Sequence, residues 1–114
     1  MTEAEPADLV AIYATFPDIE TAEATGSELV EMRLAACANI LPAMRSIYRW
    51  NGAIERDDEV VAIVKTRRAL VDAVTAAIVA RHPYDTPAVV AFPIVAGAEA
   101  YLDWVRAETA DGHR

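Results

Sequence analysis

The side chains that could do nucleophilic or soft-metal chemistry are few in this sequence of 114 residues. They are one cysteine, Cys37, and two histidines, His82 and His113. Three such ligands are too few for a structural zinc site within one chain, because such sites use four protein ligands. A single cysteine also forms no intrachain disulfide, so the fold does not depend on an oxidising compartment.

His82 and Cys37 each have a structural and a functional interpretation. His82 follows Arg81 at an expected helix end, where the helix dipole favours a protonated imidazole; metal or ligand contact is the alternative. Cys37 lies among alanines in an expected strand. A buried thiol there packs as a small apolar side chain, whereas a metal role would need a second ligand from another chain.

Four further side chains are candidates for a small-molecule site. Lys65 is the only lysine, and its compact ammonium could contact an anion at the end of an apolar strand. Tyr84 and Asp85 follow the second expected helix in a turn that prolines bracket. They are either parts of a rigid connector or, with His82 and Glu59, the walls of a pocket between subunits.

Composition and absent motifs narrow the classes of function. The formal net charge of −8 makes binding to nucleic acid or to an anionic membrane surface a poor hypothesis. Four glycines leave no glycine-rich phosphate loop, and no Gly-x-Ser-x-Gly motif is present. We therefore expect no catalytic residues and a protein that is not an enzyme. The polar, acidic start of the chain and the lack of a long apolar segment predict a cytoplasmic location.

Strands and helices alternate along the chain. Helical spacing of apolar residues predicts helices over 19–33, 67–81 and 99–108. Apolar and β-branched runs predict strands over 8–15, 36–50, 53–66 and 88–95, of which the first and last are expected to be buried. This order predicts an α+β fold, a ferredoxin-like βαββαβ sandwich with a long β-hairpin and an extra C-terminal helix. One domain over 1–114 follows, with fraying expected at 1–7 and 110–114.

The first helix is expected to bury one apolar stripe, made of Ile19, Ala22, Gly26, Leu29, Val30 and Leu34. A glycine inside a helix costs about 1 kcal/mol relative to alanine. Close approach of the helix to the sheet would offset the cost of Gly26.

A long hairpin is the strongest local prediction. Asn51-Gly52 tolerates the positive φ angles of a type I′ turn, and such a turn pairs Arg45 with Asp58 as a cross-strand ion pair. Pro42 has no N–H and marks a bulge or an edge position. The arms run up to about 14 residues, against a usual strand of 5 or 6.

The hairpin also predicts an oligomer. Its outer half carries large apolar side chains at Ile47, Tyr48, Trp50 and Ile54. A two-stranded ribbon does not bury such side chains by itself, and the simplest cover is another copy of the chain. We therefore expect these four residues at a subunit interface; for Tyr48 and Trp50, a platform for a substrate is the alternative.

Five segments, in order and at matching spacing, are similar to the CutA family of divalent-cation tolerance proteins. They are RLAACANILP at 33–42, SIYRWNG at 46–52, KT at 65–66, HPYDTP at 82–87 and YLDW at 101–104. The likeness covers roughly residues 8–108. It implies a ferredoxin-like fold, a tight homotrimer with interlocked hairpins, and a link to tolerance of copper and other divalent metals.

The resemblance also implies a copper site that this sequence does not complete. Some members use a cysteine near the end of the first strand and two consecutive histidines before the Pro-Tyr pair. Ala14 stands at the cysteine position and Arg81 at the first histidine, so only His82 is kept. The resulting prediction is a homotrimeric cytoplasmic protein of copper tolerance that binds metal ions or a small ligand near the subunit interface. The alternative is a signalling or scaffold trimer, similar in logic to the PII proteins, with no metal role.

Overall fold

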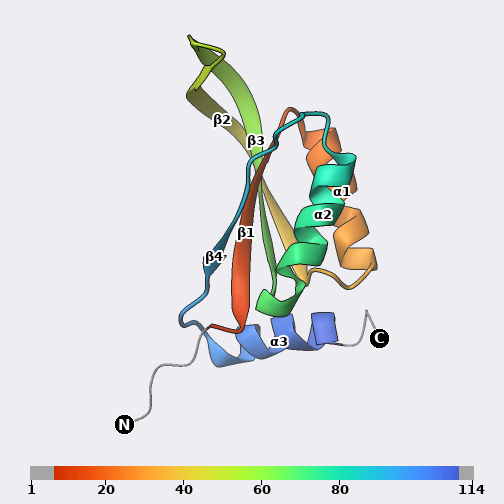
Figure 1. Cartoon of the computed structure of the whole chain (residues 1–114). Coiled ribbons are helices and arrows are strands. Elements are labelled where there is room, and N and C mark those ends of the chain that lie inside the picture. Colours follow the sequence, from red (N-terminus) through yellow and green to blue (C-terminus); the bar gives the residue numbers. More distant parts are fainter. Residues whose placement is uncertain (1–6, 111–114) are drawn as a thin grey trace.

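One antiparallel sheet of four strands organises the chain, and the computed structural model describes residues 7–110 of it (Figure 1). The strands are β1 (Leu9–Phe16), β2 (Cys37–Trp50), β3 (Ala53–Arg67) and β4 (Val89–Pro93), and their order is β2-β3-β1-β4. The helices are α1 (Ile19–Glu31), α2 (Val71–Arg81) and α3 (Glu99–Ala110), with a 3₁₀ turn at Arg68–Leu70. This arrangement confirms the predicted ferredoxin-like fold.

The core lies between the sheet and the layer formed by α1 and α2. Alternate residues of β1, from Val10 to Phe16, point into this layer, and Ala14 among them is fully buried. Leu29 of α1 and Ile78 of α2 meet them from the helix side. The helix α3 lies across one end of the sheet, where Val105 packs on Leu9 and Ala36 in a second, smaller cluster. The two helices α1 and α2 thus cover only one face of the sheet.

The helix ends differ from the predicted ones for local reasons. The helix α1 stops at Glu31 rather than at Arg33, because Arg33 takes a left-handed φ of 59°. The N–H groups of Arg33 and Leu34 then bond to the carbonyls of Val30 and Leu29, the pattern of a Schellman C-cap. At α2, Arg67 still pairs with Leu9 in the sheet, so the helix begins later than predicted.

Two smaller expectations also need correction. Ile19 and Val30 are exposed, so the buried stripe of α1 is narrower than predicted and runs through Ala22, Thr25, Gly26 and Leu29. The helix α3 extends to Ala110, beyond its predicted end. The expected fraying falls mainly on residues 1–6 and 111–114, which lie outside the described part of the chain.

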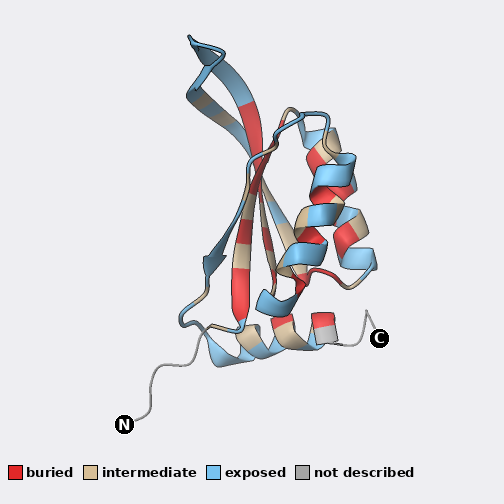
Figure 2. Ribbon diagram, in the orientation of Figure 1, coloured by how far each residue is buried: buried red, intermediate tan, exposed pale blue. Residues whose placement is uncertain are grey.

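The strand β4 is more exposed than an apolar run suggests. Val90 and Phe92 keep 49% and 54% of their surface, and Val95 beyond the strand keeps 86% (Figure 2). The strand is an edge strand, and these two residues pair with Tyr13 and Ala11 on the face that α1 and α2 leave open. The prediction of a buried strand over 88–95 is therefore wrong for this chain by itself.

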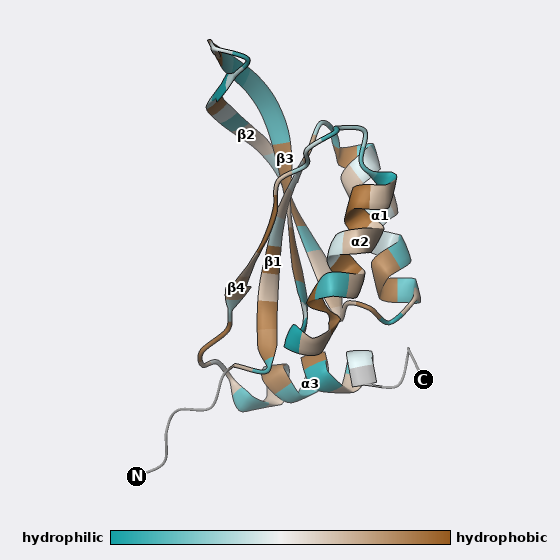
Figure 3. Cartoon of the chain, in the orientation of Figure 1, coloured by the Kyte–Doolittle hydropathy of each residue, from teal (hydrophilic) through white to brown (hydrophobic). Residues whose placement is uncertain are grey.

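The hairpin of β2 and β3 projects beyond the two layers (Figures 1 and 3). Asn51 and Gly52 have φ angles of 51° and 83°, as a type I′ turn requires. Arg45 Nε donates to Asp58 Oδ1 at 2.8 Å, which confirms the predicted ion pair. The radius of gyration is 15.2 Å, against about 13 Å for a compact domain of this size, because the hairpin extends the molecule.

Candidate functional site

A bulge in β2 decides which side chains reach the open face of the sheet. Leu41 pairs with Val61 but Met44 pairs with Glu59, so β2 has one extra residue between them, and Ala43 there has a φ of 67°. Before the bulge the odd-numbered residues of β2 lie on the open face, and after it the even-numbered ones do. Tyr13 of β1 shares that face and donates its hydroxyl to Met44 Sδ at 3.4 Å.

A cavity of about 590 Å³ lies on this face, beside the base of the hairpin. Its walls come from β1, the outer part of β2 and β3, and the turn after α2. The residues that line it are Tyr13, Thr15, Ser46, Ile47, Tyr48, Trp50, Asp57, Glu59, Tyr84, Asp85, Thr86 and Ala88. The cavity therefore unites the predicted pocket residues Glu59, Tyr84 and Asp85 with three residues predicted for the subunit interface.

Two tyrosines donate hydrogen bonds to carboxylates in this cavity. Tyr48 donates to Asp57, and this bond, followed by desolvation and repulsion from nearby acids, raises the pKa of Tyr48 to about 12. Tyr84 Oη donates to Glu59 Oε2 at 3.5 Å. Burial, and next the charge of Glu59, raise the pKa of Tyr84 above its ordinary value. Both phenols are thus neutral donors at neutral pH.

His82 positions the turn that carries Tyr84 and does not itself line the cavity. Its Nε2 lies 2.6 Å from the carbonyl oxygen of Thr15, and its Nδ1 accepts from the N–H of Tyr84 at 3.2 Å. These bonds define the tautomer with the proton on Nε2. The ring also stacks on Phe16, with centroids 4.9 Å apart. His82 thus joins β1 to the turn through a neutral ring, which is a structural role different from the protonated imidazole that the helix end predicts.

Lys65 and Cys37 form a separate cluster at the other end of the open face. Lys65 Nζ donates to Asn39 Oδ1 at 2.7 Å and lies 5.6 Å from the centre of the Tyr101 ring. Cys37 Sγ lies 3.5 Å from Tyr101 Oη, and this bond is the main reason why the pKa of Tyr101 is raised. Six residues of extended strand, about 20 Å, separate Lys65 from Glu59. Lys65 therefore lies outside the cavity, although the sequence predicts it in one small-molecule site with Glu59, Tyr84 and Asp85.

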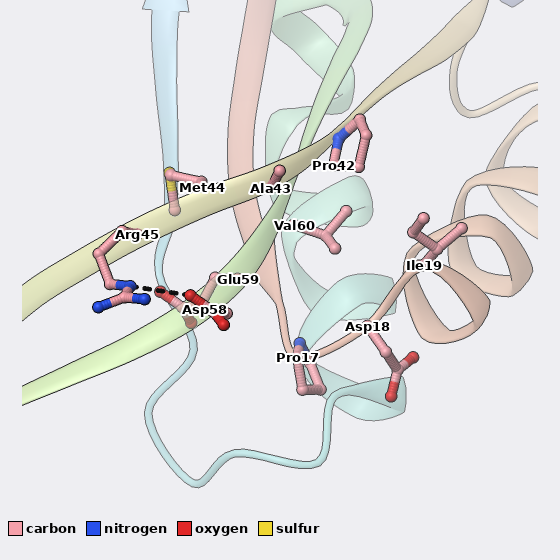
Figure 4. Close-up of a pocket in the computed structure, with 10 residues that line it drawn as sticks. All are labelled: Pro17, Asp18, Ile19, Pro42, Ala43, Met44, Arg45, Asp58, Glu59 and Val60. Atoms are coloured by element: carbon pink, nitrogen blue, oxygen red, sulfur yellow. Dashed lines mark hydrogen bonds and ion pairs between the residues drawn. The ribbon is translucent and has the colours of Figure 1, made fainter.

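A second hollow, of about 570 Å³, opens on the helix side of the bulge (Figure 4). Asp18, Met44, Arg45, Asp58 and Glu59 line it, with apolar neighbours. Asp18 accepts from the Thr21 N–H as the N-cap of α1, and Asp58 is paired with Arg45. Both aspartates thus have local partners, and only Glu59 is shared with the larger cavity.

A copper ion does not fit the residues that the described part of one chain supplies. Within residues 7–110, no three side chains among His, Cys, Asp and Glu lie close enough to hold a metal ion. Ala14 is buried in the core and has no ligand atom, and Arg81 forms an ion pair with Glu28 of α1. Both ring nitrogens of His82 already have backbone partners. The ligand set that the resemblance implies is thus incomplete in geometry as well as in sequence.

Some residues of these two sites were missed at the sequence level. Tyr13 and Asp57 line the cavity, and Asn39 and Tyr101 complete the Lys65 cluster. The signal for Tyr13 is the alternation of side chains along β1, which places Tyr13 on the face of the sheet away from the core residues Ile12 and Ala14. The signal for Asp57 is its position two residues before Glu59, on the same face of β3.

The fold and the cavity define a class: a ferredoxin-like α+β domain with a projecting hairpin and a ligand-sized cavity at its base. The chain belongs to the CutA1 divalent ion tolerance protein family, whose model matches residues 10–108. It is 43% identical over 98 residues to the divalent-cation tolerance protein CutA of Thermus thermophilus, which covers 86% of this chain and 95% of the relative. It is 41% identical to human protein CutA over 104 residues, and this match covers 91% of the chain and 58% of the relative.

Solved structures agree with this assignment. The crystal structure of CutA from Xylella fastidiosa superposes with a TM-score of 0.88 at 38% identity, covering 90% of this chain and 99% of that one. The chain spans little more than half the length of the curated plant and animal relatives that it matches. None of the helices in the described part of the chain is long and apolar enough to cross a membrane.

Proposed function

We propose that this chain acts as a homotrimeric divalent-cation tolerance protein that binds a small ligand near the subunit interface, without catalysis. The ligand site is the cavity of about 590 Å³ on the open face of the sheet, which we call the Glu59 cavity. The observation that carries the proposal is the hairpin. Ile47 keeps 63% of its surface exposed on one face of the ribbon, and Trp50 keeps 50% on the other. A ribbon with large apolar side chains on both faces needs cover on both faces, and further copies of the chain supply it.

The open face of the sheet supports the same proposal. Leu41, Val90 and Phe92 are about half exposed on this face, and they extend the apolar surface from the hairpin to β4. An assembly that covers the hairpin and this face would enclose the cavity between subunits. The names of the relatives, which refer to tolerance and not to a reaction, support a binding role.

The oligomeric state is the direct test. We expect a trimer by analytical ultracentrifugation or by light scattering after size exclusion. Trp50→Ala should weaken assembly by about 3 kcal/mol or more, as truncation of a large buried aromatic does. Val79→Ala is the control, because Val79 is similarly exposed but lies on α2, on the other side of the sheet. A monomeric wild-type protein, or a Trp50→Ala trimer as stable as the wild type, would refute the proposal.

Divalent-cation binding is the second candidate function, and the name of the Thermus relative, a divalent-cation tolerance protein, favours it. Because residues 7–110 of one chain offer no complete ligand set, we place a copper site between several subunits, with His82 and, more weakly, Cys37 as candidates. Calorimetric titration with Cu²⁺ tests this, with His82→Gln compared to wild type. Since both His82 nitrogens are occupied, we expect equal heats; a loss of heat in the variant would establish His82 as a ligand.

A trimer that binds neither metal nor small ligand would favour the scaffold alternative. The cytoplasmic location stays a prediction.

A further inference from the structure

The charged side chains that line the Glu59 cavity are all acidic. Three carboxylates line it, from Asp57, Glu59 and Asp85, and among residues 7–110 no lysine, arginine or histidine does. Four aromatic side chains, Tyr13, Tyr48, Trp50 and Tyr84, line the same space. Carboxylates together with the electron-rich faces of aromatic rings attract cations and repel anions.

Glu59 is the unusual member of this set. It is only 9% exposed, yet no cationic side chain within residues 7–110 forms an ion pair with it. Its recorded partner is the neutral hydroxyl of Tyr84, at the long distance of 3.5 Å. The neighbouring Asp58 is mostly exposed and has Arg45 as a partner. Burying a carboxylate without a cationic partner costs free energy. A positively charged ligand beside Glu59 would offset that cost.

The geometry favours an organic cation over a metal ion. The three carboxylates lie around the cavity and do not converge as a metal-binding group does. The volume of about 590 Å³ is that of a small-molecule pocket and far exceeds what a single ion fills. Apolar area in the walls, from the ring of Trp50, suits a hydrocarbon portion next to the charge.

We propose that this cavity binds a protonated aliphatic amine, with the ammonium group beside Glu59 and the hydrocarbon portion against Trp50 and Tyr48. The amine donates N–H bonds to the Glu59 carboxylate, and the aromatic faces stabilise its charge. This inference rests on the proposed function in one respect, since it names the ligand class of the site assigned there. Ligand binding and the number of subunits are measured separately.

Calorimetry with three shape-matched probes tests the ligand class. Cyclohexylammonium, cyclohexanol and cyclohexanecarboxylate have the same ring with a positive, neutral or negative substituent. At neutral pH and constant ionic strength, we expect saturable binding of the ammonium, at least tenfold tighter than that of the alcohol, and no binding of the carboxylate. Quenching or enhancement of Trp50 fluorescence, absent in Trp50→Phe, should follow the ammonium titration.

Glu59→Gln and Glu55→Gln separate the buried carboxylate from general charge. Both remove one negative charge from the same face of β3, but Glu55 is exposed and does not line the cavity. We expect Glu59→Gln to weaken ammonium binding at least tenfold and Glu55→Gln to change it less than twofold. Glu59→Gln should also raise the melting temperature of the ligand-free protein, because an unpaired buried charge is removed. If Glu59→Gln does not fold, Glu59→Asp, which retracts the carboxylate, takes its place.

The outcomes separate this inference from the proposed function. Equal binding of the ammonium and the carboxylate, or wild-type affinity in Glu59→Gln, would overturn the amine site. Light scattering on the same samples reports the trimer independently. A trimer that does not bind cyclohexylammonium therefore contradicts only the ligand class, whereas a monomer that binds it contradicts only the assembly.

Discussion

Gly26 of α1 faces Ala38 of β2 so closely that a methyl group added to the glycine would stand 2.9 Å from the Ala38 Cβ. Carbon atoms in packed interiors rarely approach nearer than about 3.5 Å. The helix can therefore lie this near to the sheet only because residue 26 has no side chain. This contact explains a glycine in the middle of a helix, as the sequence-based expectation proposed.

Gly26→Ala should therefore destabilise the protein although alanine is the better helix former. The intrinsic gain is about 1 kcal/mol, and overpacking of a tight contact costs about 1–3 kcal/mol. We expect a lower midpoint in urea unfolding. Ser27→Ala is the control, because Ser27 is the exposed neighbour on the same helix. A Gly26→Ala protein more stable than wild type would show that α1 moves away freely.

Thr66 should be sensitive to loss of its hydroxyl. The side chain is fully buried, and its Oγ1 donates to the carbonyl oxygen of Leu34 at 2.6 Å, which joins β3 to the segment after α1. Thr66→Val keeps the shape but removes the donor, at an expected cost of about 1–3 kcal/mol in the free energy of unfolding. Thr66→Ser keeps the hydroxyl and should lose less. If Ser and Val cost the same, the methyl group and not the hydrogen bond is what stabilises this position.

Tyr48 should ionise late in an alkaline titration followed by phenolate absorbance. Its pKa is raised to about 12, first of all by the hydrogen bond to Asp57. A tyrosine whose folded pKa exceeds its unfolded value of about 10 stabilises the fold below pH 10, and this contribution is lost as the pH rises through 12. Asp57→Asn should lower the pKa of Tyr48, while Glu55→Gln should lower it less. An ordinary tyrosine titration in the wild type would contradict the hydrogen bond.

The helix α3 should loosen in acid before the sheet does. Arg106 forms two bonds with the Asp8 carboxylate, at 2.8 and 3.2 Å, and these lower the pKa of Asp8. A depressed carboxyl pKa stabilises the fold above its unfolded value, and this contribution is lost as the pH falls through the folded one. Hydrogen exchange in α3 should therefore accelerate in Asp8→Asn at neutral pH. Exchange in β1 and β3 serves as the internal control.

Local patterns predicted the hairpin well. The Asn51-Gly52 turn fixes the register, and the register in turn dictates the Arg45–Asp58 pair and the exposed apolar side chains. The alternation of elements along the chain likewise predicted the fold class. These features depend on residues near one another in sequence, where propensity and periodicity act directly.

Features that depend on distant contacts were harder to predict. The apolar run of β4 does not reveal which face of the sheet the helices cover, so its exposure was not foreseen. Lys65 and Glu59 share a strand and a face, and only the extended geometry of β3 shows that they belong to different clusters. The end of α1 depends on a left-handed arginine, a conformation that few non-glycine residues adopt.

The bulge between Leu41 and Met44 fixes the character of the cavity wall. It shifts the alternation of side chains along the outer part of β2 by one residue, so that Ser46, Tyr48 and Trp50 face the carboxylates of β3. Without the bulge, a strand of the same sequence would keep its original phase and would present the side chains of Arg45, Ile47 and Arg49 there instead. Deletion of residue 43 would remove the extra residue together with the bulge, so Met44 would still lie opposite Glu59 and the aromatic lining would be kept. One irregular backbone unit thus decides between an aromatic lining and a basic one.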